Sequence, residues 1–370
     1  MALRTEIRQT IDMCRHCFMC RHANPTFLVT KLDAHTPRGY ALALSRIDDG
    51  RARWTEDVAR KLYQSTLDGL CSELCEFDWR EDLVVQAGRE EAVRMGMAPP
   101  PVVRAAQRRL ADGPASSTPT SLPVAPERID REGADTLFIT GLEARERAPG
   151  TIVATTALLD HFGSDWTVLS TERDPGIDLW ELGYTEAAMI AAQRFVEEVE
   201  QLRPARIVTG SSRVLRALRQ SLPAPELGAL PETEHLSEFL VSRLDDARDT
   251  ETSERPVAYH DPCALGRRVG VLDAPREVIR KVTGAPPVEF RHARAIAECC
   301  GEGGLLPEVD PDLAARMAVA QLERLPDGVT TLVTACPGCR SQLGAAAQQV
   351  RASIEVTDIS ELVVARLGLH

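Results

Sequence analysis

Nine of the ten cysteines fall into two separate groups, and this grouping limits how the 370-residue chain can fold. Thiolates are soft, electron-rich ligands that bind iron together with sulfide, so a group that holds a cluster must converge in space. The first group is Cys14, Cys17, Cys20 and the distant Cys75, and the second is Cys263, Cys299, Cys300, Cys336 and Cys339. Only Cys71 is left over. Such a distribution is typical of a chain that carries electrons.

Composition argues against several other classes of protein. The net charge of −12, from 43 basic and 55 acidic residues, argues against nucleic-acid binding. No run of 18 or more apolar residues is present, so we expect no transmembrane segment. The first residues lack the apolar stretch of a secretory signal, and the cysteines are too sparse for a disulfide scaffold. We therefore expect a cytoplasmic location.

The hydrophobic pattern predicts an α+β fold with four parts. The first part is typical of a helical domain, and the second is a Pro/Ser-rich linker. The third and fourth parts alternate strands with helices, which is the rhythm of parallel sheets. The expected boundaries are 1–98, 99–133, 134–250 and 251–370.

The last two parts repeat each other in sequence. Residues 207–209 match 332–334, and residues 233–244 match 356–367. Internal repetition indicates that two copies of one unit solve the same packing problem. We therefore expect two α/β repeats, each built on its own parallel sheet.

The N-terminal cysteines follow one half of a two-cluster ferredoxin motif. The C-x2-C-x2-C spacing at 14–20 fits C-x2-C-x2-C-x3-C-P, with Asn24 in place of the fourth cysteine. A second half can be registered on Cys71 and Cys75. In such ferredoxins the fourth cysteine of each half ligates the other cluster, so Cys75 completes a four-thiolate site. The prediction is one cubane [4Fe–4S] cluster in an α-helical, ferredoxin-like domain.

The complementary set of positions is Ser65, Asp68, Cys71 and Asn24. Because this set has one thiolate, we expect it to hold no cluster and interpret Cys71 as a relic. Asp68 is interpreted as a solvated helix carboxylate rather than a ligand. A zinc site is the alternative for the four thiolates of the first group, although zinc sites usually pair two C-x2-4-C knuckles.

The second group has the spacing C-x35-C-C-G-x34-C-x2-C. Cys263 and Cys336 each follow a predicted strand, so we expect both at the carboxyl edge of a sheet, where α/β folds place their sites. Gly301, Gly303 and Gly304 are expected to let the backbone come close to a cluster.

With these motifs the chain resembles the cysteine-rich CCG-domain family of iron–sulfur oxidoreductases. Its relatives include the B and D subunits of heterodisulfide reductase and the iron–sulfur subunits of glycerol-3-phosphate, glycolate and lactate oxidation systems. The matching segments are TPRG (36–39), HDPCALGRR (260–268), ECCGEGG (298–304) and TACPGC (334–339). The resemblance covers essentially the whole chain. It implies that the five cysteines of the second group bind a second iron–sulfur cluster, a noncubane [4Fe–4S].

The first repeat departs from the family pattern. Leu142 takes the place of the leading cysteine, 174–176 (DPG) takes the place of CCG, and Ser211 and Val214 replace the last two cysteines. This repeat is expected to survive as a scaffold or docking surface, which weakens the case for heterodisulfide reductase activity.

Other interpretations of the second group remain open. The adjacent cysteines could form a redox disulfide, or the five could hold zinc with one spare thiol. His260, close to Cys263 in the chain, could relay a proton, although a structural role is the commoner one for such a residue.

The resemblance implies an electron-transfer subunit of an oxidoreductase complex, not catalytic alone and with no catalytic residue assigned. The expected partner is a flavoprotein dehydrogenase subunit, and the second carrier an electron-transfer flavoprotein or a quinone-linked system. No nucleotide-binding GxGxxG or P-loop is present to supply the chain's own cofactor. The alternatives are a heterodisulfide-reductase-like thiol/disulfide reductase acting at the CCG cluster and a non-redox zinc-bound interaction module.

Overall fold

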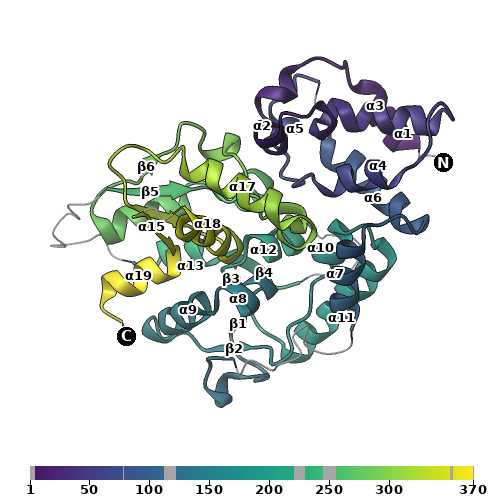
Figure 1. Cartoon of the computed structure of the whole chain (residues 1–370). Coiled ribbons are helices and arrows are strands. Elements are labelled where there is room, and N and C mark those ends of the chain that lie inside the picture. The colour runs from purple at the N-terminus through teal and green to yellow at the C-terminus, as the bar shows by residue number, and fades with distance from the viewer. Residues whose placement is uncertain are drawn as a thin grey trace.

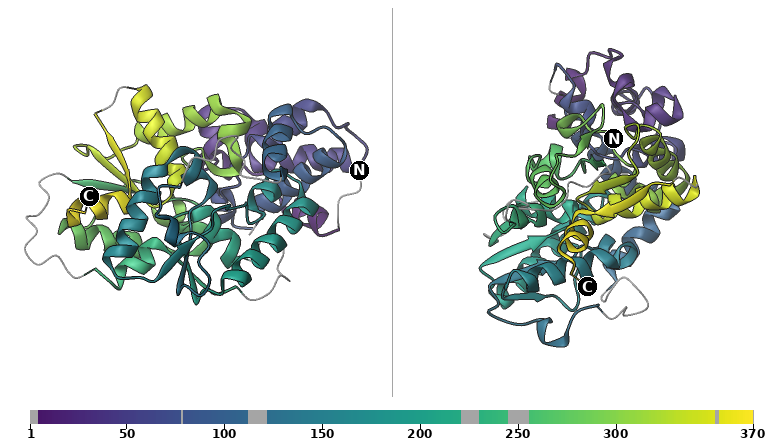
Figure 2. Two further views of the ribbon diagram at one scale, coloured as in Figure 1. Left: turned by 90° about the horizontal axis from the view of Figure 1, so that it is seen from below. Right: turned by 90° about the vertical axis from the view of Figure 1, so that its left-hand side faces the viewer.

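The computed structural model describes residues 5–77, 79–111, 122–220, 230–244, 256–350 and 353–369. Helices dominate the N-terminal part, and two parallel sheets follow, which confirms the predicted α+β class (Figure 1). The two ends of the chain lie at opposite ends of the molecule, the first helices at one and the last helix at the other (Figure 2). Among the described helices, none has the length and apolar character needed to cross a bilayer.

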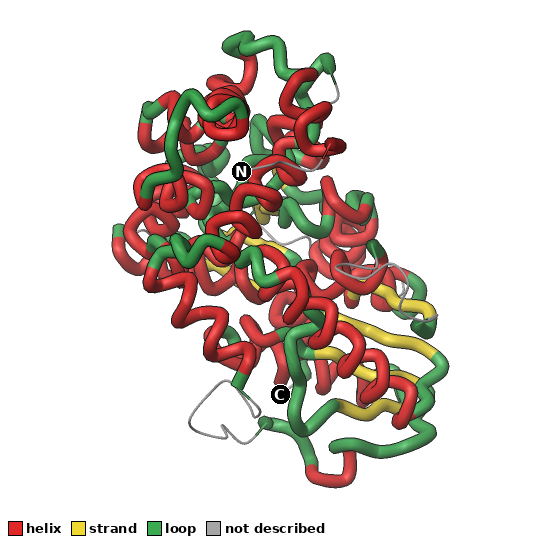
Figure 3. Tube along the Cα trace, turned by 90° about the vertical axis from the view of Figure 1, so that its right-hand side faces the viewer, coloured by secondary structure: helices red, strands yellow, loops and turns green. Residues whose placement is uncertain are grey.

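The N-terminal part contains helices and loops, with no strand in its described residues (Figure 3). Its helices are α1 (Thr5–Met13), α2 (Pro25–Thr30), α3 (Pro37–Asp48), α4 (Glu56–Tyr63), α5 (Leu70–Glu73), α6 (Glu81–Arg94) and α7 (Pro100–Leu110). Thr36 and Thr55 cap α3 and α4 by accepting from backbone N–H groups. The last helix, α7, lies within the predicted linker, and residues 112–121 of that linker lie outside the described residues.

Each repeat holds a four-stranded parallel sheet with the same strand order, β2-β1-β3-β4 and β6-β5-β7-β8. The first repeat comprises β1 (Thr136–Ile139), α8 (Leu142–Arg147), α9 (Pro149–His161), β2 (Trp166–Val168), α10 (Ile177–Glu181), α11 (Thr185–Leu202), β3 (Arg206–Thr209), α12 (Ser212–Arg219), β4 (Glu232–His235) and α13 (Leu236–Val241). The second comprises β5 (Val257–His260), α14 (Gly266–Val269), α15 (Ala274–Thr283), β6 (Val288–Glu289), α16 (Leu306–Val309), α17 (Pro311–Leu322), β7 (Thr331–Thr334), α18 (Pro337–Gln349), β8 (Glu355–Asp358) and α19 (Ile359–Leu367).

The strand register confirms the internal repeat residue by residue. Thr209 of β3 lies opposite Ile139 and His235, and its counterpart Thr334 of β7 lies opposite His260 and Asp358. The helix after the last strand of each sheet begins with a capping box, closed by a glutamate in the third helical position.

The two repeats share one hydrophobic core. Helix α9 of the first repeat packs on α19 of the second, and α13 of the first packs on α15 of the second. Because α9 corresponds to α15 and α13 to α19, the two contacts are symmetrical. Members of this core are Phe138, Trp166 and Phe239 from the first repeat and Tyr259, Val278 and Leu362 from the second. The pairs α8·α18 and α12·α14 repeat the same symmetry nearer the cysteines. The arrangement is a pseudo-twofold one, which turns the carboxyl edges of β1 and β3 toward those of β5 and β7.

Two arginines with buried side chains hold the helical domain against the repeats. Arg89 of α6 donates to the carbonyl oxygens of Leu62, Ser65 and Glu181, the last of which belongs to α10. Arg267 of α14 donates to the Asp68 carboxylate and carbonyl and to the carbonyl oxygens of Ala295 and Ala297. Its side chain is 2% exposed and that of Asp68 is 4% exposed. Both parts of the fold therefore depend on buried charge-assisted hydrogen bonds.

Substituting Arg267→Met is expected to lower the free energy of unfolding by about 3–5 kcal/mol, because the Asp68 carboxylate would stay buried without a counter-charge. Urea unfolding followed by circular dichroism measures the effect. The double variant Arg267→Met/Asp68→Asn is the control and should recover part of the loss, since it removes the unpaired charge. Equal loss in both variants would contradict the ion-pair explanation.

Candidate functional site

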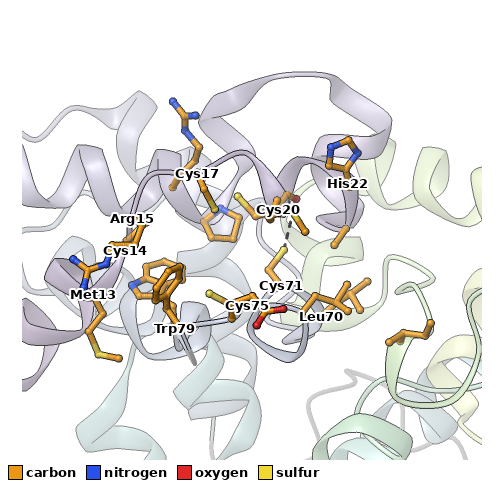
Figure 4. Close-up of a pocket in the computed structure, with 18 of the residues that line it drawn as sticks. Met13, Cys14, Arg15, Cys17, Cys20, His22, Leu70, Cys71, Cys75 and Trp79 are labelled. Atoms are coloured by element: carbon orange, nitrogen blue, oxygen red, sulfur yellow. Dashed lines mark hydrogen bonds between the residues drawn. The ribbon is translucent and has the colours of Figure 1, made fainter.

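The N-terminal cysteines line one cavity of about 460 Å³ (Figure 4). Cys14 directly follows α1, Cys20 lies in a short 3-10 turn (Met19–His22), and Cys75 follows α5. Cys17, in the loop between, is exposed to solvent. The structure thus brings the whole predicted first group to one place, together with the left-over Cys71.

The surroundings of this cavity suit a soft metal centre. Four thiols from two distant segments share a volume within the range of small-molecule sites. Burial raises the pKa of the Cys14 and Cys20 thiols, so metal binding would have to displace their protons. Arg38 lies at the wall and lowers the pKa of both thiols, although by less than burial raises it. The donor set fits an iron–sulfur cluster.

The second set of ferredoxin positions is engaged in other interactions. Asn24 caps α2 by accepting from Phe27 N at 2.8 Å, and Ser65 lies 3.4 Å from the Glu81 carboxylate. Cys71 is buried, with its thiol 3.9 Å from the Cys20 carbonyl oxygen. That the set holds no cluster stays a prediction.

The interpretation of Asp68 as a solvated helix carboxylate was wrong. It is buried in the loop before α5, where its Oδ2 accepts from Arg267 at 2.8 Å and from Leu70 N at 3.2 Å. Its neighbour Glu81 is also buried, and burial raises the pKa of Glu81 to about 8. Sequence reasoning assigned no role to Glu81 or Arg267. The position of Arg267 directly after the CCG motif HDPCALG was the one available signal for the arginine.

The second group of cysteines converges at the edge of the second sheet. Cys263 follows β5 and Cys336 lies between β7 and α18, at the carboxyl edge as predicted. The Cys300 and Cys339 sulfurs are 3.3 Å apart, and further thiol contacts join Cys263 to Cys299, Cys299 to Cys300 and Cys336 to Cys339. All five are free thiols in the structure, and none of these contacts is a disulfide.

The close contacts among these sulfurs favour a single thiolate in the metal-free group. Hydrogen bonds from the neighbouring thiols of Cys299 and Cys339 lower the pKa of Cys300 to about 6. Contacts with Cys300 and Cys336 raise the pKa of Cys339, because touching sulfurs repel one another when more than one is charged. A cation among the sulfurs would remove this conflict, so the donor set fits an iron–sulfur cluster better than free thiols.

His260 lies within 4.8 Å of the Cys300 and Cys339 sulfurs. Burial lowers its pKa to about 4, so the imidazole is neutral near pH 7. Its Nε2 has no hydrogen-bond partner in the described part of the chain. The ring is therefore available to hydrogen-bond a group held by these sulfurs.

The glycines of the CCG loop make close backbone contacts with other parts of the chain, and their approach to a cluster stays a prediction. A Cβ at Gly303 would lie 2.3 Å from the Thr66 carbonyl oxygen, and one at Gly304 would lie 2.7 Å from that of Ser65. Gly301 has φ +96° and abuts the backbone of α17. The contacts in the structure thus join the loop to the helical domain and to α17.

Across the pseudo-twofold interface the first repeat carries charged and polar groups instead of thiols. Ser211 caps α12 and hydrogen-bonds the buried Glu143, while Asp174 accepts from Asp178 N and Leu179 N. A small cavity of about 40 Å³ lies between Glu143, Ser212 and Arg213 of this repeat and the five cysteines. Its arginines are paired: Arg213 and Arg216 both bind Glu181.

The two cysteine sites are separated by little more than one layer of backbone. Residues 66–68 line the small cavity, whereas Leu70 and Cys71 line the N-terminal one. Likewise Glu298 lines the N-terminal cavity and the next residue, Cys299, lies in the second group. Arg267 bonds to both connecting segments and fixes their spacing.

In the metal-free chain, iodoacetamide should modify Cys17 well before Cys299, Cys300, Cys336 and Cys339, because alkylation needs access to the sulfur. Cys17 is exposed, and these four cysteines are at most 5% exposed. Peptide mass spectrometry over a time course measures the order. Urea-unfolded protein, in which all ten thiols should react together, is the control, and equal rates in the folded chain would contradict the structure.

Comparison with known proteins agrees with this site. Residues 257–344 match the cysteine-rich domain family CCG. The D subunit of dihydromethanophenazine:CoB–CoM heterodisulfide reductase from Methanosarcina acetivorans is 29% identical over 254 residues, which are 66% of this chain and 62% of that protein. Its counterpart from Methanosarcina barkeri is 26% identical over 337 residues, 85% of this chain and 80% of the relative.

A third relative is the EtfAB:quinone oxidoreductase of Syntrophomonas wolfei, 29% identical over 152 residues, which are 38% of this chain and 21% of that protein. The chain thus spans less than two thirds of the Methanosarcina acetivorans relative and about a fifth of the Syntrophomonas protein. The resemblance expected from the motifs is confirmed: the chain carries a CCG cysteine-rich domain and is related to the iron–sulfur oxidoreductases.

Proposed function

We propose that the chain is an iron–sulfur electron-transfer subunit of a flavin-dependent oxidoreductase complex in the cytoplasm. Cys14, Cys17, Cys20 and Cys75 would hold a cubane [4Fe–4S] cluster. Cys263, Cys299, Cys300, Cys336 and Cys339 would hold a second, noncubane [4Fe–4S] cluster. Bound clusters would supply one-electron redox chemistry that amino-acid side chains lack.

The observation that carries this proposal is the closeness of the two thiol-lined cavities. Segments 66–71 and 298–299 each pass from one cavity to the other within a few residues. A chain with two unrelated metal sites would not need to place them on opposite sides of one backbone layer. This geometry supports a continuous route for electrons from one site to the other.

The partners follow from the relatives. One relative is named EtfAB:quinone oxidoreductase, which supports an electron-transfer flavoprotein on one side and a quinone-linked carrier on the other. A flavoprotein dehydrogenase subunit is the proposed electron donor or acceptor at one end of the route.

A heterodisulfide-reductase-like thiol/disulfide reductase is the second candidate, and the names of the Methanosarcina relatives favour it. A substrate disulfide would need open space beside Cys299 and Cys300. The adjoining cavity measures only about 40 Å³, close to the volume of one or two water molecules. The facing repeat also offers no thiolates, so burial supports the electron relay.

Metal analysis tests the ligand sets. The chain prepared without oxygen should contain about eight iron atoms, the sum of two four-iron clusters. Cys75→Ala should fall to about four, and the matched variant Cys71→Ala should stay at about eight, because Cys71 belongs to the incomplete set. A full iron content in Cys75→Ala would contradict the assignment of Cys75 as the fourth ligand of the first cluster. Zinc instead of iron in the unsubstituted chain would overturn the proposed function.

The closeness of the two sites predicts magnetic interaction between them. The EPR spectrum of the fully reduced chain should differ from the sum of the spectra of Cys75→Ala and Cys300→Ala, because each variant retains one of two neighbouring paramagnets. A spectrum equal to that sum would argue against a continuous route. Iron content of each variant is the control for loss of the wrong cluster.

A further inference from the structure

Exposed apolar side chains gather at the mouth of the N-terminal cavity. Met13, Phe18, Met19, Leu74 and Phe77 are each between 44% and 59% exposed. All but Phe18 line the cavity, and Phe18 directly follows the exposed Cys17. Contiguous apolar patches of this kind on a folded protein mark interaction sites more often than chance.

Positive charge is concentrated in one segment at the same mouth, although Glu76 and Glu298 also line the cavity. Residues 13–23 contain two arginines and two histidines and no acidic residue, although the whole chain has a net charge of −12. Arg15 lies over the Phe77 ring at 5.5 Å, and Arg38 lies over the Phe18 ring at 4.3 Å. Neither arginine forms an ion pair with any described residue. The exposed Arg15 is therefore free to attract an acidic surface, and Arg38, whose Nη1 is buried, adds its positive charge from the cavity wall.

The second site is less exposed, with Cys263 partly exposed and its other four cysteines buried. Cys299, Cys300, Cys336 and Cys339 are at most 5% exposed, and the cavity beside them lies between the two repeats and the helical domain. Electron transfer between proteins needs close contact with a redox centre. The exposed edge at Cys17 is thus the place where an outside carrier can come near the chain's sulfur ligands.

We propose that the rim formed by Met13, Arg15, Phe18, Met19, Arg38, Leu74 and Phe77 is the docking surface for an acidic protein electron carrier. The proposal rests on the proposed function and assigns the carrier to the N-terminal site. Carboxylates of the carrier face Arg15 and Arg38, and its apolar centre covers Phe18 and Met19. One electron passes between this site and the carrier, a flavoprotein or ferredoxin-type protein. Such transient complexes are small and are steered by charge.

The test uses the full chain and two purified probes of opposite charge, an acidic flavodoxin and a basic c-type cytochrome. Dissociation constants are measured by biolayer interferometry at about 20 and about 300 mM NaCl, concentrations between which screening shortens the range of surface charges severalfold. Flavodoxin should bind at low salt and weaken severalfold at high salt, while the cytochrome should not compete with it for this rim.

Substitutions locate the surface. Arg15→Gln and Phe18→Ser should each raise the dissociation constant for flavodoxin about three- to tenfold, the usual effect of removing a contact residue. The matched controls are Arg203→Gln and Met189→Ser in the first repeat, which remove an exposed arginine and an exposed methionine and should change binding less than about twofold.

Several results would overturn the docking surface. These are no flavodoxin binding at low salt, equal effects in rim and control variants, or release of a self-associated dimer by Phe18→Ser, which would assign the rim to a second copy. Binding of anionic phosphatidylglycerol vesicles that is lost in Arg15→Gln, without flavodoxin binding, would assign it to a membrane. Iron and sulfide are measured on the same samples. Absence of iron and sulfide would contradict the proposed function. If the clusters are present but the rim substitutions leave flavodoxin binding unchanged, only the docking surface is contradicted.

Discussion

The contact on which the functional centre depends is the buried guanidinium of Arg267. It extends from the helix that follows the first CCG cysteine and bonds to Asp68 of the helical domain and to the loop before the cysteine pair. A buried arginine with a carboxylate partner and three carbonyl partners has its charge and geometry satisfied. With this contact in place, the N-terminal cavity and the five-cysteine site lie on two sides of the same short segments. Arg268 adds a second link, because it donates to the Leu67 carbonyl oxygen at 2.7 Å and to the Asp82 carboxylate at 3.0 Å.

The two repeats have the same architecture, but only the second keeps the cysteines at the carboxyl edge of its sheet. Strand order, register and the capping box after the last strand are the same in both. In the second repeat the carboxyl edge carries thiols. In the first, Ser211 and Asp174 occupy equivalent positions and hold helix starts by hydrogen bonds. The first repeat still contributes half of the shared core and the Glu181 carbonyl that Arg89 binds, so the fold depends on it.

Much of the site could be predicted from the sequence, because cysteine spacing reflects the geometry of a cluster. The grouping at 14–20 with Cys75 and the placement of Cys263 and Cys336 at a sheet edge are both found in the structure. The role of Asp68 could not be predicted. Nothing in the sequence around Asp68 indicates that it forms a buried ion pair with an arginine 199 positions away. The packing contacts of the CCG-loop glycines could not be predicted for the same reason, since their close neighbours come from residues 65 and 66 and from α17.

By itself the sequence determined which residues can hold metal, that strands and helices alternate after a helical start, and that the chain contains one unit twice. These properties follow from local spacing and periodicity, which any folded form of the chain must respect. Tertiary structure alone decided that the two cysteine groups are neighbours, that the first is the more exposed and the second mostly buried, and that buried ion pairs join the parts. Such relations depend on contacts between segments hundreds of residues apart, which packing selects and local pattern does not encode.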